Sequence, residues 1–174
     1  MTIYRIIEDS DSYDSIVLDD DVDVQIFDGR RLVGSWKPLA VQIESQGKVP
    51  DFLSFLPGAF AMPEASWDKI SWLLRDDAEA LPLEIAPARV PKFVAVNPIR
   101  VVDCLDRQRA KFNLLPSGAI EFPLESYAFV TAETGKVALF RLPETRRSEI
   151  IATERFRQAV ESLNLTGLIF QRLA

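Results

Sequence analysis

The last third of the chain carries the clearest helical pattern in the sequence. Apolar residues recur there at positions i, i+3, i+4 and i+7, which predicts an amphipathic helix with a single apolar face. Thr153 stands directly before this stretch and is a favoured N-cap residue. Short β-branched runs at residues 150–152 and 168–170 predict a strand on either side of the helix. The apolar positions of the helix are Phe156, Ala159, Val160 and Leu163.

A second helix is predicted over residues 64–79. Trp67, Ile70 and Leu74 follow one another at helical spacing, and Trp72 widens the apolar face. We expect both tryptophans to lie in the core or at a contact between this helix and a sheet.

Most of the remaining sequence consists of short strand patterns separated by turn residues. β-branched and aromatic residues are frequent in these segments, and several of them alternate apolar with polar positions. The segments are residues 2–7, 16–18, 22–27, 36–43, 81–85, 93–96, 118–122, 127–131 and 137–142. The order strands, helix, strands, helix, strand predicts an α+β fold with a mixed, mainly antiparallel sheet or sheets and two main helices. A βαβ fold would alternate strands and helices throughout.

The chain is predicted to form a single domain. Its 174 residues are the length of one core, and no linker or low-complexity tract interrupts the sequence. Within this domain, residues 1–40 form an acidic N-terminal strand region and residues 41–170 form the body.

Composition narrows the chemistry that the chain can perform. It has no histidine and a single cysteine, Cys104, which excludes Ser-His-Asp and Cys-His catalysis and the usual zinc sites. We expect Cys104 to be a buried, inert thiol. Residues 29–34 have the glycine spacing of a phosphate-binding loop, but Ser35 and Trp36 stand where lysine and a hydroxyl residue are required. The sequence therefore predicts no catalytic activity, no cofactor and no metal.

Charge is distributed very unevenly along the chain. The first 28 residues hold nine acids and one base, a charge of -8, so the rest of the chain carries +2. A concentration of acids attracts basic partners and repels nucleic acid. We therefore predict contacts with a basic protein and none with DNA or RNA. The residues predicted to make these contacts are Asp14, Asp19, Asp20, Asp21 and Asp23. The alternative is that these aspartates cap turns and keep an edge strand soluble.

The sequence also bears on location. The first residues have neither the basic start nor the apolar run of a secretory signal. The longest uncharged stretch, residues 52–63, is too short to span a bilayer and contains Pro57 and Gly58. We therefore expect a cytoplasmic protein without membrane contact.

Several motifs together carry a resemblance to a known family. They lie at residues 50–53, 60–64, 93–98, 102–106, 139–142, 150–156 and 165–170. Their order over residues 41–170 resembles immunity protein family eleven of bacterial polymorphic toxin systems, formerly a domain of unknown function. The family usually has a serine shortly after its Leu-Asp pair, where this chain has Arg107, Gln108, Arg109 and Ala110.

The resemblance implies a protein that binds and neutralises a cognate toxin by occluding its active surface. An acidic inhibitor suits a toxin with a basic surface, such as a nuclease that acts in the cytoplasm. Two other interpretations remain open. The first is a non-catalytic adaptor for another partner. The second is an enzyme that uses carboxylates such as Asp103 and Asp106 with a divalent metal.

Overall fold

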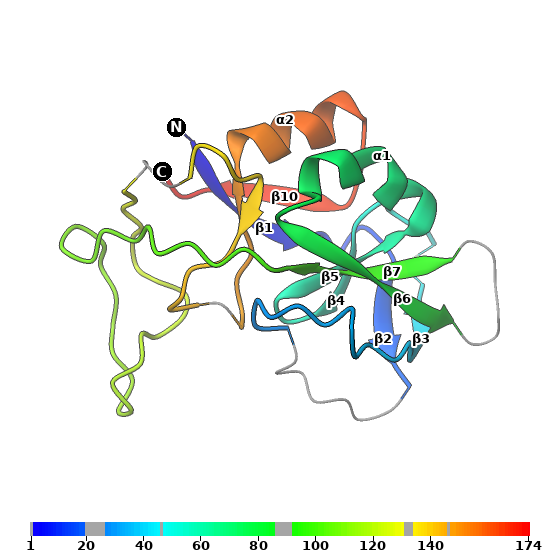
Figure 1. Cartoon of the computed structure of the whole chain (residues 1–174), viewed down its shortest axis with the longest axis horizontal. Coiled ribbons are helices and arrows are strands. Elements are labelled where there is room, and N and C mark those ends of the chain that lie inside the picture. The colour runs from blue at the N-terminus through cyan, green and yellow to red at the C-terminus, as the bar shows by residue number, and fades with distance from the viewer. Residues whose placement is uncertain (1, 20–26, 46, 86–91, 131–133, 146) are drawn as a thin grey trace.

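A computed structural model gives the fold of the chain and describes residues 2–19, 27–45, 47–85, 92–130, 134–145 and 147–174. The described residues form two helices and two β-sheets (Figure 1). All strand pairs are antiparallel except β3 with β6. The predicted α+β fold with mixed, mainly antiparallel sheets and two main helices is therefore confirmed.

The smaller sheet joins the two ends of the described chain. Its strand order is β10 (Leu168–Arg172), β1 (Ile3–Glu8), β9 (Ile151–Thr153) and β8 (Leu139–Phe140). Strand β1 thus lies inside this sheet, paired with a strand from the end of the chain on each side.

The larger sheet has six strands. Their order is β2 (Ser15–Leu18), β3 (Leu39–Glu44), β6 (Ala78–Ile85), β7 (Phe93–Pro98), β5 (Ala59–Pro63) and β4 (Leu53–Leu56). Strands β5 and β7 are buried along their whole length, because Phe60 and Val96 on one side and Ala61 and Ala95 on the other belong to two separate apolar clusters.

The central core lies where both helices meet both sheets. Helices α1 (Glu64–Leu74) and α2 (Glu154–Ser162) lie next to each other over the sheets (Figure 1). Phe156 and Val160 of α2 occupy this core with Phe60 of the larger sheet and Ile6 of the smaller one. The apolar face predicted from Phe156, Ala159, Val160 and Leu163 is confirmed, with the first three buried and Leu163 partly buried against the same core.

The first helix is shorter than predicted. It ends at Leu74, and residues from Ala78 onward belong to β6. The side chain of Asp77, between them, accepts a hydrogen bond of 2.6 Å from the backbone N–H of Ala138, which holds the segment after the helix against the start of β8. Trp67 packs against the central core as expected, but the expectation for Trp72 is wrong because 60% of its surface is exposed.

Thr153 is the N-cap residue of α2, as predicted, but its hydroxyl does not cap the helix. It donates instead to the carbonyl oxygen of Val137 at 2.9 Å. This bond ties the start of the helix to the strand region before β8.

Residues 99–137, which we call the arm, lead from β7 to β8. Among its described residues, Cys104, Leu105 and Leu124 pack on the outer face of the smaller sheet. The described residues of its two halves are joined by isolated bridges and not by a continuous strand ladder, so the strands predicted at 118–122 and 127–131 are wrong for the residues that the structure describes there. Prolines at 116 and 123 withhold the N–H groups that a continuous strand ladder needs. Figure 1 shows the arm on the side of the smaller sheet that faces away from the larger sheet.

The packing of α2 yields a stability prediction. Val160→Asp would bury an unpaired charge in the central core, where Val160 is almost fully buried. We expect a loss of about 3–5 kcal/mol in the free energy of unfolding, measured by urea denaturation. Gln158→Asp, on the exposed side of the same helix, is the control and should change stability little. Equal effects from the two substitutions would contradict the packing of α2.

Candidate functional site

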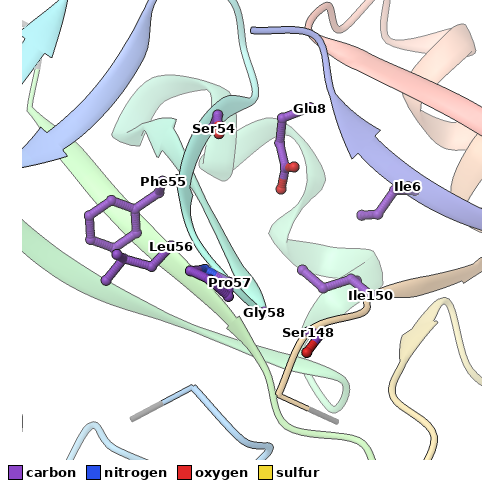
Figure 2. A pocket seen from close by; sticks show the side chains of 9 residues that line it. All are labelled: Ile6, Glu8, Ser54, Phe55, Leu56, Pro57, Gly58, Ser148 and Ile150. Atoms are coloured by element: carbon purple, nitrogen blue, oxygen red, sulfur yellow. The ribbon is translucent and has the colours of Figure 1, made fainter. Parts of the chain in front are cut away.

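A pocket of about 250 Å³ lies between the two sheets, which we call the intersheet pocket (Figure 2). Its apolar wall comes from both sheets and from the turn between β4 and β5. The apolar lining residues are Ile6, Ile150, Phe55, Leu56 and Pro57. The polar side chains are those of Glu8, Ser54 and Ser148. Because Pro57 and Ser148 are exposed, the pocket reaches the solvent.

Glu8 faces this pocket because of the alternation of side chains along β1. Successive side chains of a strand point to opposite faces, so Glu8 lies on the same face as Ile6. Ile6 belongs to the central core, and Glu8 comes two residues later, where that core opens into the pocket. Figure 2 shows the Glu8 carboxylate directed into the space between Ser54 and Ile150.

Burial raises the pKa of Glu8 to about 7, and a hydrogen bond from its own backbone N–H offsets only part of this effect. In the described part of the chain, no side chain donates a hydrogen bond or forms an ion pair with this carboxylate. The carboxyl group is therefore about half ionised near pH 7.

Gly58 separates the pocket from a buried cation. Its φ of +81° is a left-handed conformation that favours glycine. A Cβ at this position would lie 2.6 Å from a guanidinium nitrogen of Arg141 and 2.8 Å from the carbonyl oxygen of Phe27. The pocket wall can therefore approach Arg141 this closely only with glycine at position 58.

Arg141 is fully buried behind this wall. Its guanidinium donates to the carbonyl oxygens of Gly58 and of Pro98, the latter at 2.7 Å, and to the side-chain oxygen of Asn97 at 3.3 Å. Burial lowers its pKa to about 10, and attraction to Asp28 offsets part of this decrease. Arg141 thus remains charged at neutral pH and joins the smaller sheet to the ends of β5 and β7.

The same polar network holds residues 28–36 against the larger sheet. The Asn97 side chain donates to Glu79 and to the carbonyl oxygen of Arg30, both at 2.9 Å. Glu79 in turn accepts a hydrogen bond of 2.5 Å from the backbone N–H of Leu32. Buried polar groups joined in this way are stabilising only as a set, because each would be costly alone.

A second polar cluster fastens the arm to β1. Arg5 donates to Glu149 at 2.8 Å and to the hydroxyl of Tyr127 at 2.6 Å. The Tyr127 hydroxyl donates to Glu149 at 2.7 Å, and burial near this carboxylate raises the pKa of Tyr127 to about 12. The base of the arm is therefore held in place by charged hydrogen bonds as well as by apolar contacts.

The aspartates predicted to contact a partner do not share one environment. Asp14 is only 3% exposed, and its carboxylate accepts hydrogen bonds from the backbone N–H groups of Gly47 and Lys48. It therefore holds a turn, as in the alternative interpretation, and little of its side chain is exposed. Asp19 is exposed just after β2. Asp20, Asp21 and Asp23 lie outside the described residues, so their contacts remain a prediction.

The residues considered for other chemistry have local structural partners. Asp103 forms an ion pair of 2.9 Å with Arg107, and Asp106 accepts hydrogen bonds from the backbone N–H groups of Gln108 and Arg109. Cys104 is buried, and burial together with nearby acids raises its pKa to about 12. The thiol is therefore a poor nucleophile, as predicted.

Two features of the surface were not predicted from the sequence. Leu114, Leu115 and Phe122 of the arm are exposed, Leu114 to 62%, and the Phe122 ring also lies 5.2 Å from the Arg5 guanidinium. Trp72 is exposed on α1. Exposed apolar groups of this kind occur at protein interfaces. The length of the arm, with its few clear strand patterns, is the signal that could have indicated it.

Comparison with models of known protein families finds no match to this sequence. A search of curated proteins finds no match either. No helix within the described ranges combines the length and the apolar character needed to cross a membrane.

The network around Arg141 yields a second stability prediction. Arg141→Met would leave the carbonyl oxygens of Gly58 and Pro98 without this donor inside the core. We expect a loss of about 3–5 kcal/mol in the free energy of unfolding by urea denaturation at pH 7. Arg75→Met, at an exposed position after α1, is the control and should cost less than about 0.5 kcal/mol. A similarly small loss for Arg141→Met would mean that the network is dispensable.

Glu8 yields a prediction about pH. Because its pKa is raised to about 7 in the folded state, the folded chain holds this proton more tightly than the unfolded chain. The contribution of Glu8 to stability is therefore largest below the ordinary glutamate pKa and is lost as pH rises through about 7. Glu8→Gln should remove this loss and stabilise the protein by about 1–3 kcal/mol at pH 8, with a smaller difference at pH 5.

The measurement is urea denaturation of both proteins at the two pH values. Glu84→Gln, which removes an exposed carboxylate from β6, is the control and should show no such pH-dependent difference. A Glu8→Gln effect that is equal at pH 5 and pH 8 would contradict the shifted pKa.

Proposed function

We propose that this chain is an immunity protein that binds a cognate bacterial toxin and neutralises it by occluding its active surface. The toxin proposed is a protein with a basic surface, such as a nuclease acting in the cytoplasm, where the immunity protein would also act. The family resemblance over residues 41–170 supports this proposal. In this function the chain works as a non-catalytic binding protein.

The observation that carries the proposal is the concentration of negative charge in the first 28 residues, which amounts to -8. Rim charges of this kind raise the association rate with a partner of opposite charge, and desolvated charge pairs slow dissociation. Asp11 and Asp19 are exposed on either side of β2 and are available for such contacts. The exposed apolar residues of the arm and of α1 would suit the desolvated part of an interface.

An adaptor for a different partner is the alternative that the exposed apolar residues also support. Genomic position and toxicity separate the two functions. An immunity gene should lie beside a toxin gene, and its product should restore growth when that toxin domain is expressed in the same cell. Failure to restore growth, despite normal expression of both proteins, would reject the immunity function.

The acidic segment can be tested by changing Asp19, Asp20, Asp21 and Asp23 together to asparagine. We expect the fold to persist and the association rate with the toxin domain to fall. The wild-type rate should also fall as salt rises to physiological strength, where the Debye length is about 8 Å. The measurement is binding kinetics at low and physiological salt.

The matched control removes four exposed acids elsewhere in the chain, so that both variants carry the same net charge. The control residues are Asp68, Asp76, Glu84 and Glu121. A slower rate only in the first variant would place the contact at the acidic segment. Equal rates in wild type and both variants would mean that this segment serves solubility alone.

A further inference from the structure

The intersheet pocket combines several apolar side chains with an exposed surface that is mostly polar and includes one carboxylate. Ile6, Ile150 and Leu56 supply apolar contacts, and Glu8 is the only charged side chain among the described residues that line the pocket. A ligand that fits this arrangement has an aliphatic stem and a cationic head. Lysine and arginine side chains have this form, and they commonly bury the stem while the charged head seeks a polar partner.

We infer that the intersheet pocket receives a lysine or arginine side chain of the partner protein, with Glu8 as the counter-charge of its cationic head. This inference rests on the proposed function, because it assigns the occupant to the toxin. It gives that interface a specific anchor outside the acidic aspartates predicted from the sequence.

The size of the pocket favours one side chain over a larger ligand. Its volume of about 250 Å³ lies below the range of about 300–1,000 Å³ that is usual for small-molecule and cofactor sites. A single buried anchor in a small pocket is a common centre of binding energy in protein interfaces, and arginine is frequent in this role.

No described cationic side chain near Glu8 forms an ion pair with its carboxylate. Arg141 lies behind Gly58 and is engaged with backbone carbonyl oxygens and Asn97. Arg147, which precedes Ser148 in the chain, has an interaction of its own. Asp9, which follows Glu8, accepts a hydrogen bond from the backbone N–H of Ser12. An incoming cation would therefore meet a carboxylate that no described side chain neutralises.

Cation binding should depend on pH. Ionisation of Glu8, with a pKa of about 7 in the free protein, is needed for the ion pair. The ionised fraction rises about tenfold between pH 6 and pH 8, so affinity for a cation should rise by a similar factor, with a proton released on binding.

The first experiment uses probes in place of the toxin. Nα-acetyl-arginine methylamide and Nα-acetyl-lysine methylamide are titrated into the isotope-labelled protein, with the neutral citrulline analogue as control. We expect the cations to shift the backbone amide resonances of Ser54, Gly58 and Ser148, more tightly at pH 8 than at pH 6. The citrulline analogue should bind at least about tenfold more weakly.

Two variants test the residues. Glu8→Gln removes the charge, and Ser148→Leu fills the pocket while keeping Glu8. Both should weaken probe binding at least about tenfold, whereas Glu84→Gln should leave it unchanged. Absence of cation binding by wild type, or equal binding by wild type and Glu8→Gln, would overturn the inference.

The second experiment measures binding of the same proteins to the toxin domain encoded beside this gene. Glu8→Gln and Ser148→Leu should each raise the dissociation constant at least about tenfold. Normal toxin binding by both variants would overturn the inference and leave the proposed function intact. Probe binding without any toxin binding by wild type would instead overturn the proposed function, and with it the assignment of the occupant.

Discussion

The buried guanidinium of Arg141 is the interaction on which the arrangement of the two sheets depends. Arg141 directly follows β8 of the smaller sheet, yet its hydrogen bonds go to the turn after β4 and to the end of β7 in the larger one. Removing such a charge from water is costly, so it is tolerated only where several acceptors surround it. The side-chain oxygen of Asn97 and the carbonyl oxygen of Gly58 are two of these acceptors. The close approach of Arg141 requires glycine at position 58, and the bond to Asn97 holds the end of β7, where the arm begins.

Local sequence patterns predicted those helices and strands that bury one face and expose the other. The helix of Phe156 and Val160 could be recognised because its apolar spacing matches its single buried side. The end of α1 and the exposure of Trp72 could not be predicted in this way, because both depend on contacts with residues distant in the sequence. Asp77, just after the helix, accepts a hydrogen bond from Ala138, a residue 61 positions later, and no local pattern encodes that contact.

The candidate site was predicted only in its general electrostatic character. Counting charges found the acidic segment, but counting cannot distinguish Asp14, which holds a turn, from Asp19, which is exposed. Glu8 stands among many acids in the sequence and has no distinguishing neighbour. Glu8 becomes a candidate site residue only because both sheets enclose it in a pocket, and the pocket is formed by segments that are distant in the sequence.

The position of β1 has a consequence for synthesis of the chain. Strand β1, residues 3–8, lies between β9 and β10. It therefore has no partner strand in the smaller sheet until residues 151–172 have been synthesised. Pairings this distant in sequence slow folding, and domains of this kind form late during translation. The smaller sheet, the surface under the arm and the pocket at Glu8 therefore form together, once residues 151–172 are available to pair with β1.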